Sequence, residues 1–384
     1  MPEAVIVDAV RSPMGRGKQG GALSTVHAVD LLSAVIRGLV ERTGIDPGTV
    51  DDVMVGCVGQ AGEHSATPGR QAWLAAGYPV HVPSVTIERK CGSGQQAVEF
   101  AAAGIVAGLY DIAVAGSVES MSRVPMGSAR MGADPFGPSV RSRFPDLVPQ
   151  GVSAELVAHK WGLSRAELDA YAVRSHRRAA ATSFAAEIVP VGGVKDDETI
   201  RPDSTVERLA TLRAAFDTDE YRSRFPAVEW VVTAGNSSQI TDGASALLLM
   251  SQERATALGL RPRARILASS VVGDDPTLML TGPIPATRKV LARAGITADD
   301  VDAFEVNEAF ASVPLAWQRE IGVPDEKLNP CGGAIALGHP LGASGARLMT
   351  TLINHLEATG GRLGLQTMCE AGGMANATLI EIVR

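Results

Sequence analysis

The chain has 384 residues, 45% of them hydrophobic, and a formal net charge of −7 at pH 7. This length exceeds that of a usual single domain and predicts two or three units around a substantial core. The acidic balance and the lack of a basic block argue against a nucleic-acid partner. No apolar run reaches the ~18 residues that a membrane span needs, so we expect no membrane insertion.

The chain contains four cysteines, at Cys57, Cys91, Cys331 and Cys369. They are too few and too scattered for a disulfide framework, and none has zinc-ligand spacing. We therefore expect free thiols, a cytoplasmic location and no bound metal. A strand pattern begins at Ala4, which leaves no room for a signal peptide.

The first part of the chain alternates between helix and strand patterns. Apolar periodicity predicts a helix over 30–40, a strand over 52–58, a helix over 95–107 and a strand over 112–115. Such alternation predicts an α/β fold with a largely parallel or mixed sheet.

The middle of the chain, over 117–239, is richer in Arg, Pro, Ser and Asp. Amphipathic patterns predict helices over 153–161 and 165–185, among proline-rich turns. We interpret 117–239 as an insertion that packs over the core. Residues 242–250 then return to an apolar pattern, interpreted as a core helix and strand.

The last part repeats the plan of the first, with helices predicted over 287–294 and 343–356 and strands over 303–306 and 362–368. Segments 41–55 and 292–306 both read as a helix end, a capping glycine, a short loop and a strand, 251 positions apart. The repeat predicts two similar halves.

Cys91 follows a strand pattern and precedes Gly-Ser-Gly and a helix pattern. A thiol at a helix N-terminus is exposed to positive partial charge, which favours the thiolate, and Arg89 and Lys90 would add to this effect. The alternative is a buried structural cysteine. The glycines favour a nucleophile.

His339 stands in a glycine-rich turn 248 positions after Cys91, so the two hold nearly equivalent places in the two halves. A cysteine nucleophile needs a base that is remote in sequence but close in space. The alternative is an ordinary histidine in a turn, and the pairing with Cys91 favours the base.

Two more polar residues follow strand patterns. Cys369 precedes a glycine loop, and Asn307 begins Asn-Glu-Ala-Phe, where it could instead cap the next helix. Strand ends in α/β sheets converge on a common crevice. We therefore predict that Cys91, Asn307, His339 and Cys369 share one site.

These motifs resemble those of the thiolases, the family of acetyl-CoA acetyltransferases and 3-ketoacyl-CoA thiolases. The resemblance runs from end to end through the segments Cys91–Gly94, Gly116–Ser122, Ala234–Ala244, Asn307–Phe310, Gly332–Pro340 and the loop after Cys369. It implies a five-layered α-β-α-β-α thiolase fold, with one half from 1–116 and 240–262, the other from 263–384, and a loop domain inserted over 117–239. It also implies a homodimer or homotetramer.

The resemblance also implies roles for the site. Cys91 would attack the carbonyl carbon and carry the acyl group, His339 would take its proton, and Cys369 would act as acid and base on the acetyl unit. Asn307 would hold a water beside His339 in one oxyanion hole, and the backbone N–H groups of Cys91 and Ala371 would form the other. Acyl-CoA and CoA are the implied substrates, with no tightly bound cofactor.

The inserted domain would bind CoA. Ser238 would meet the pantetheine arm, and Arg201 and Phe216 would lie near the adenine nucleotide. Gln150 and Gly151 stand where many members have His-Met in the acyl pocket, and Gly151 predicts room for a larger acyl chain.

Three departures from the family pattern are visible. Ala371 replaces the first glycine of a three-glycine loop, and a positive φ there would cost about 1 kcal/mol or more. The segment Asp217–Trp230 is longer than usual, and Cys331 has no assigned role.

The implied activity is cleavage of a 3-ketoacyl-CoA by CoA to acetyl-CoA or propionyl-CoA and a shortened acyl-CoA, or the reverse condensation. We favour a bulky or branched acyl chain, with a biosynthetic acetoacetyl-CoA thiolase as the alternative. A ketoacyl synthase shares the fold but lacks an acid/base cysteine, so Cys369 argues against it. The four polar residues argue against a non-catalytic acyl-CoA-binding protein.

Overall fold

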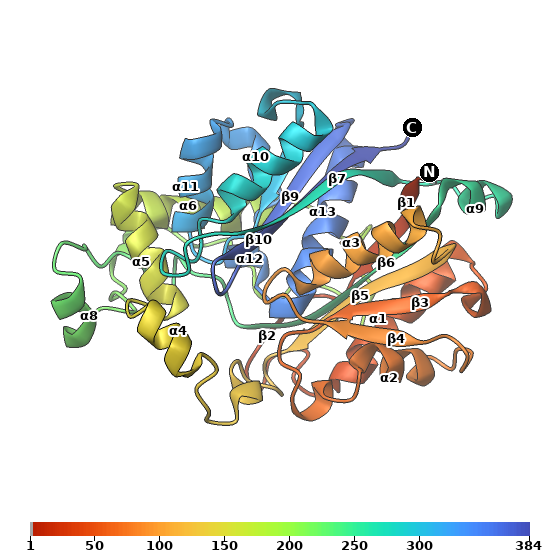
Figure 1. Ribbon diagram of the computed structural model, residues 1–384, viewed down its shortest axis with the longest axis horizontal. Coiled ribbons are helices and arrows are strands. Elements are labelled where there is room, and N and C mark those ends of the chain that lie inside the picture. Colours follow the sequence, from red (N-terminus) through yellow and green to blue (C-terminus); the bar gives the residue numbers. More distant parts are fainter. Residues whose placement is uncertain (1–2) are drawn as a thin grey trace.

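The computed structural model describes residues 3–384 and has five layers, which can be followed in Figure 1. The core elements of the first half are β1 (Ala4–Arg11), β2 (Gly15–Arg16), α1 (Ala28–Thr43), β3 (Asp52–Gly56), α2 (Pro68–Ala75), β4 (Ser84–Ile87), α3 (Ser93–Val106), β5 (Ile112–Ser120), β6 (Thr241–Ser251) and α9 (Gln252–Ala257). Those of the second half are β7 (Ala264–Gly273), α10 (Pro283–Ala294), β8 (Ala303–Val306), α11 (Ser312–Ile321), α12 (Ala334–Leu337), α13 (Ser344–Thr359), β9 (Leu363–Glu370) and β10 (Met374–Ile382).

The strands form one hydrogen-bonded path in the order β4-β3-β5-β6-β1-β7-β10-β9-β8, with β2 beside β6. The path narrows between β1 and β7, where, among residues 3–384, only Val5 with Arg265 and Ile6 with Ala264 are paired. This narrow join divides the path into two sheets, one for each half.

The two sheets have the same topology, which confirms the predicted repeat. In the first, β3 pairs in parallel with β4 and β5, while β6 is antiparallel to β5 and β1. In the second, β8 is parallel to β9, and β10 is antiparallel to β9 and β7. Leu328 forms an isolated parallel bridge to Phe304 of β8, at the place that corresponds to β4.

Helices cover both faces of each sheet. Helices α1 and α2 cover the outer face of the first sheet, and α10 packs on the outer face of the second beside α11. Between the sheets, α3 and α13 pack against each other. This is the predicted α-β-α-β-α arrangement.

The capping glycines of the repeat are also observed. Gly44 ends α1 with φ 66°, and Gly295 ends α10 with φ 68°. Both are left-handed, a conformation that glycine adopts without steric cost.

Two further glycines allow α3 and α13 to meet at their N-terminal ends. A Cβ on Gly345 would lie 2.2 Å from the backbone nitrogen of Gln95, and one on Gly94 would lie 2.7 Å from the carbonyl oxygen of Gly342. Since real Cβ contacts are never so short, only glycine fits at either position. The two helices therefore touch through their backbones.

The inserted region packs over one side of the core (Figure 1). Its helices are α4 (Gly137–Arg143), α5 (Gln150–Lys160), α6 (Arg165–Ala181), α7 (Val206–Ala210) and α8 (Asp219–Arg224). The buried Arg11 at the end of β1 anchors it, with Nε 2.5 Å from Glu187 Oε1 and Nη1 2.7 Å from Asp197 Oδ1.

The structure corrects two local predictions and excludes one alternative. Residues 242–250 lie in a single strand, β6, with no helix; every residue of β6 is buried, so its apolar run lacked the alternation that identifies a strand. Strand β5 continues to Ser120, past the predicted start of the insertion at 117. Asn307 does not cap a helix, because α11 begins only at Ser312.

Within residues 3–384, none of the helices combines the length and the apolar character required to cross a bilayer.

Candidate active site

The predicted site residues lie at equivalent ends of the two halves. Cys369 lies at the end of β9, and Asn307 directly follows β8. Cys91 and His339 precede the N-termini of α3 and α13, the two ends that the glycine contacts bring together.

Side-chain contacts confirm that Cys91 and the His339 segment are neighbours. Leu341, from the loop after His339, and Leu348 of α13 pack around Cys91 together with Met368 of β9. Cys369 directly follows Met368 in β9, and charge on the Cys369 sulfur would raise the pKa of Cys91.

A tight turn holds Cys91. Lys90 has a left-handed φ of 45°, and the N–H groups of Gly92 and Ser93 donate to the carbonyls of Arg89 and Lys90, both at 3.0 Å. A non-glycine residue in this region is strained, and such strain persists where the surroundings fix the conformation.

The expected stabilisation of a Cys91 thiolate is not observed. Burial raises the pKa of Cys91 well above its ordinary value, and the nearby Cys369 and Glu370 raise it further. The Lys90 ammonium contacts Glu88 at 2.9 Å, so it is already paired. Because Cys91 stays a thiol in this state, attack requires a base.

His339 is arranged as that base. Its Nδ1 lies 2.6 Å from Ser344 Oγ, which itself lies 3.0 Å from the Pro340 carbonyl oxygen. The carbonyl can only accept, so the Ser344 hydroxyl donates to it and accepts the Nδ1–H. Nε2 then carries the lone pair, and it is buried with no partner among the described residues.

Burial keeps the imidazole neutral. The pKa of His339 falls to about 3 because the ring is buried, and the positive charge of Arg347 lowers it further. The ring can therefore accept a proton at neutral pH. Once protonated, it returns that proton readily because the charged form is disfavoured.

The His339 loop is held by its neighbours. A Cβ on Gly338 would lie 2.1 Å from Thr241 Oγ1. The His339 N–H points at the Gln239 carbonyl at 2.9 Å and at Thr241 Oγ1 at 3.1 Å. The start of β6 thus fixes the base.

Cys369 and Asn307 form the other side of the site. Burial raises the pKa of Cys369 to about 12, although the adjacent Asn307 amide opposes this. Neither Asn307 Nδ2 nor Oδ1 has a full hydrogen bond to any residue within 3–384, and the side chain is buried. A buried amide of this kind beside the Cys369 thiol is suited to holding a water or an oxyanion.

The strain expected at Ala371 does not arise. Gly372 and Gly373 adopt the positive φ angles of the loop, 94° and 75°, whereas Ala371 does not lie in that region. The two glycines that remain occupy the positions that require glycine.

The three predicted CoA residues lie around the segment that leads into β6. Arg201 donates from Nη2 to Gln239 Oε1 at 2.9 Å, next to Ser238, whose N–H donates to the Ala309 carbonyl. Arg201 therefore lies beside Ser238. The segment of Ser238 and Gln239 also contacts His339 and the loop after Asn307.

Phe216 lies against Gly151, and it also borders the Ser238 segment, because its ring packs on Phe310 and Phe310 forms a bridge to Ser237. A Cβ on Gly151 would lie 2.0 Å from Phe216 Cζ, and the ring also packs edge-on against Phe310 at 6.1 Å between centroids. The predicted open space beside Gln150 and Gly151 is thus filled by a ring 65 positions later in the chain, a contact that the sequence does not show. Phe216 contacts the proposed acyl pocket directly.

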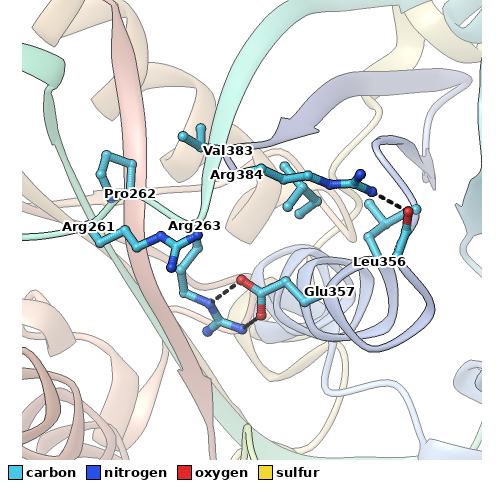
Figure 2. Close-up of a pocket in the computed structure, with 10 residues that line it drawn as sticks. Arg261, Pro262, Arg263, Leu356, Glu357, Val383 and Arg384 are labelled. Carbon is cyan, nitrogen blue, oxygen red and sulfur yellow. Dashed lines mark hydrogen bonds and ion pairs between the residues drawn. The ribbon is translucent and has the colours of Figure 1, made fainter.

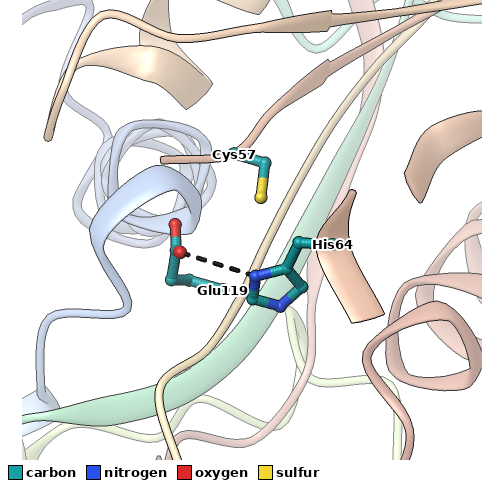
Figure 3. Close-up of side chains that lie close together, drawn as sticks. All are labelled: Cys57, His64 and Glu119. Atoms are coloured by element: carbon teal, nitrogen blue, oxygen red, sulfur yellow. Dashed lines mark ion pairs between the residues drawn. The ribbon is translucent and has the colours of Figure 1, made fainter. Parts of the chain in front are cut away.

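A second cluster of candidate ligands, Cys57, His64 and Glu119, is shown in Figure 3. His64 Nδ1 lies 3.0 Å from the Gly59 carbonyl, and its Nε2 accepts from Ser120 N–H, so both nitrogens are committed.

Glu119 is equally committed, since its carboxylate accepts N–H groups from Val58, Gly59 and Gly342 at 2.8–2.9 Å. These donors leave the cluster few lone pairs for a metal. Its role is to hold the loop after His339.

A cavity of about 340 Å³ lies at the opposite end of the strands, between the start of β7 and the ends of α13 and β10 (Figure 2). Its Arg263 is paired with Glu357 and Asp8. None of the candidate catalytic residues lines this cavity.

Several residues of this site were not predicted. Ser344 fixes the His339 tautomer, and its only sequence signal was a hydroxyl at the start of a helix pattern. Glu370, buried directly after Cys369, could have been flagged as a charged residue at a strand end.

Comparison with known proteins identifies the family. The model of the thiolase N-terminal domain matches residues 4–253, and that of the thiolase C-terminal domain matches residues 260–382. The chain belongs to the thiolase family. The predicted boundary between the halves, at 262–263, lies just after the start of the second match.

Relatives match over almost the full length of this thiolase. It is 48% identical to the steroid 3-ketoacyl-CoA thiolase FadA6 of Mycobacterium tuberculosis, over 99% of this chain and 94% of that protein. It is 45% identical to a 3-ketoacyl-CoA thiolase of Salmonella typhimurium, over 100% of both. The crystal structure of a Bacillus anthracis acetyl-CoA acetyltransferase has a TM-score of 0.87 and 37% identity, covering 100% of this chain and 99% of that one.

Replacing Ser344 with Ala removes the acceptor for the His339 Nδ1–H. The proton can then move to Nε2, so less of the enzyme has a free lone pair there. We expect Ser344→Ala to slow alkylation of Cys91 by iodoacetamide at neutral pH about 10-fold or more, within the range that a general base supplies. The measurement is the rate of mass labelling at Cys91.

Ser128→Ala is the matched control, because Ser128 also donates to a proline carbonyl, at 2.6 Å from Pro125, but on the exposed surface. Equal labelling rates in wild type and Ser344→Ala would show that Ser344 does not set the tautomer.

Proposed function

We propose that the chain is a degradative thiolase, which uses CoA to cleave a 3-ketoacyl-CoA to acetyl-CoA or propionyl-CoA and a shortened acyl-CoA. The observation that carries this proposal is the meeting of Cys91, the free Nε2 of His339, and Cys369 beside Asn307. The similarity to 3-ketoacyl-CoA thiolases favours the degradative direction over biosynthesis.

The first half-reaction forms an acyl-enzyme. The Cys91 sulfur adds to the 3-keto carbon while its proton moves to His339 Nε2. The carbon–carbon bond then breaks, and the acetyl-CoA enolate takes the proton of Cys369. The acyl group stays on Cys91 as a thioester.

The second half-reaction restores every group. The CoA thiol gives its proton to the Cys369 thiolate and attacks the Cys91 thioester. As the tetrahedral intermediate collapses, the imidazolium of His339 returns its proton to Cys91. The charged forms of Cys369 and His339 are unfavourable in the buried site. Each group therefore passes its proton on quickly, which suits these proton transfers.

Preplaced donors would stabilise the oxyanions. We assign one oxyanion hole to His339 and a water held by Asn307, and the other to the backbone N–H groups of Cys91 and Ala371. The unpaired Asn307 amide supports the first assignment. CoA would lie along Ser238 and Arg201, with Arg201 suited to phosphate.

The reaction needs no tightly bound cofactor, because Cys91 carries the acyl group and CoA enters as a co-substrate. We place the enzyme in the cytoplasm, since its four cysteines are free and buried, as suits a reducing compartment.

We further propose a bulky or branched acyl chain. The steroid thiolase relative supports this choice. The half-buried Phe216 ring, seated over Gly151, would be displaced by such a chain and would limit the depth of the pocket when it is in place.

We also propose self-association through β4, as a homodimer or as the building block of a homotetramer. Strand β4 ends the sheet path, so its outer edge has no strand partner within residues 3–384. Val85 on this strand is 44% exposed, and Phe100 on the neighbouring α3 is 47% exposed. Exposed apolar edges of this kind pair with another chain.

The roles assigned to Cys91 and Cys369 predict different losses of thiolysis activity when each is replaced by alanine. Cys91→Ala should abolish thiolysis, because no acyl-enzyme can form. Cys369→Ala should lower kcat by about 10²- to 10⁴-fold, the contribution of general acid–base catalysis, yet retain alkylation at Cys91. Cys331→Ala, at a buried thiol outside the site, is the control and should stay active. Unchanged thiolysis in Cys91→Ala would exclude the proposed nucleophile.

The acyl pocket predicts a substrate preference. The wild-type enzyme should show a higher kcat/KM with a branched 3-ketoacyl-CoA than with acetoacetyl-CoA. Phe216→Ala should increase that ratio by about 10-fold, as expected when a pocket gains space for several methylenes. Phe225→Ala, in the same segment, should leave the ratio unchanged. A wild-type preference for acetoacetyl-CoA would contradict the bulky substrate.

The edge strand predicts a dimer or tetramer in light scattering. Val85→Lys should shift the mass towards the monomer, because a charge on the edge opposes pairing. Leu258→Lys, at a surface residue of similar exposure, should have no effect. A monomeric wild type would contradict this proposal.

A further inference from the structure

Glu370, the last residue of β9, is fully buried, and neither of its carboxyl oxygens has a hydrogen-bond partner among the described residues. Such a group is costly as an anion, because burial removes its water without replacing it.

A second unpaired acceptor lies beside it. Asn376 on β10 is fully buried, and its Oδ1 also has no donor within residues 3–384. Since Met374 pairs with Glu370 and Asn376 with Met368, Glu370 and Asn376 are diagonal neighbours on one face of the sheet.

Both oxygens flank the turn that carries the nucleophile. A Cβ on Gly92 would lie 1.9 Å from Glu370 Oε1 and 3.1 Å from Asn376 Oδ1. The Asn376 amide donates from Nδ2 to the Gly92 carbonyl at 3.3 Å. Two adjacent acceptors that lack a donor would both be satisfied if one of them carried a proton.

The internal repeat provides a comparison. Glu119 of β5 lies 251 positions before Glu370, the offset of the two halves, and it contacts Gly342 in the loop after His339. Glu119 accepts three backbone N–H groups, whereas Glu370 accepts none. The two carboxyl groups hold equivalent places but have opposite hydrogen-bond surroundings.

The charges around Glu370 are mixed. Burial raises its pKa to about 8; Arg89 lowers it, and Glu99 and Glu88 raise it. The neighbouring Cys91 and Cys369 are neutral thiols in this state.

We propose that Glu370 is a positioning residue held as the neutral acid, whose O–H donates to Asn376 Oδ1 and thereby fixes the Gly92 turn beside Cys91. This inference rests on the proposed function, in which Cys91 is the nucleophile. Ionising Glu370 breaks the hydrogen bond and places a negative charge near the Cys91 sulfur. That charge raises the pKa of Cys91 and opposes the oxyanion formed at the same place.

The sign of the pH dependence follows. Below its pKa, Glu370 is neutral, the turn is braced, and the enzyme is active. As the pH rises through about 8, Glu370 ionises and activity falls. The stability that neutral Glu370 contributes to the folded state is also lost as the pH rises, since its pKa in the folded state lies above the ordinary carboxyl value.

The test compares kcat/KM for thiolysis in the wild type and in Glu370→Gln from about pH 6 to about pH 10. The wild type should lose activity about tenfold per pH unit on the alkaline side, as a single titration requires. Glu370→Gln keeps a donor for Asn376 but cannot ionise, so this loss should be absent. Glu99→Gln should move the loss to lower pH, because Glu99 raises the pKa of Glu370.

Two measurements do not depend on turnover. Infrared difference spectra between pH 6 and pH 10 should show a protonated carboxyl band disappearing. The part of this band that comes from Glu370 should be missing in Glu370→Gln, whereas the part from Glu305, whose pKa burial also raises to about 8, should remain. The pH profile of Cys91 alkylation should shift to lower pH in Glu370→Gln. An unchanged alkaline loss in the variant, or a carboxyl band as strong in the variant as in the wild type, would overturn the inference.

These readouts separate the inference from the proposed function. If the wild type cleaves no 3-ketoacyl-CoA but the carboxyl band and the alkylation shift are found, the proposed function fails and the role of Glu370 stands. If Glu370→Gln does not fold, Glu99→Gln decides, because an alkaline loss that does not move to lower pH in this variant would overturn the inference.

Discussion

The site depends on a backbone-to-backbone contact between two helices. At Gly345 and Gly94 no Cβ can be accommodated, so α3 and α13 meet with their N-terminal ends side by side between the sheets. Each helix carries one reactive group just ahead of its first turn, Cys91 on one and His339 on the other. Residues 248 positions apart therefore become neighbours through a packing requirement that glycine alone meets. A larger residue at either glycine would separate the nucleophile from its base before it altered any catalytic group.

Burial, rather than helix electrostatics, sets the protonation of this site. A helix N-terminus favours a thiolate, but the effect is modest for an exposed group and is outweighed by desolvation here. Burial raises the pKa of both Cys91 and Cys369 and lowers that of His339 to about 3. All three groups are therefore neutral in the free enzyme. Charge would arise only when a substrate carbonyl draws the proton of Cys91 towards His339, which limits reaction of the thiol with other electrophiles.

The sequence predicted the features that occur in both halves and those marked by a strong local pattern of residues. The two halves, the capping glycines and the placement of Cys91, Asn307, His339 and Cys369 at equivalent ends all followed from periodicity and spacing. What it missed depends on contacts between distant segments. The Phe216 ring fills the space over Gly151. Segment 242–250 was predicted as a helix and a strand, because both faces of β6 are buried and its apolar run shows no alternation. A glycine in the sequence predicts open space only when no other residue of the fold fills that space.

The repeat also explains why Glu370 differs from its counterpart. Glu119 and Glu370 each contact the segment that carries the other half's reactive group, the His339 loop in one case and the Cys91 turn in the other. Three backbone N–H groups donate to the Glu119 carboxyl group. A carboxylate charge beside Cys91 would oppose both the thiolate and the oxyanion formed from it. Glu370 has no such N–H donors and instead faces the acceptor oxygen of Asn376, which keeps the Glu370 carboxyl group neutral. The two halves thus use the same residue type for the same bracing contact, with its charge adjusted to the chemistry next to it.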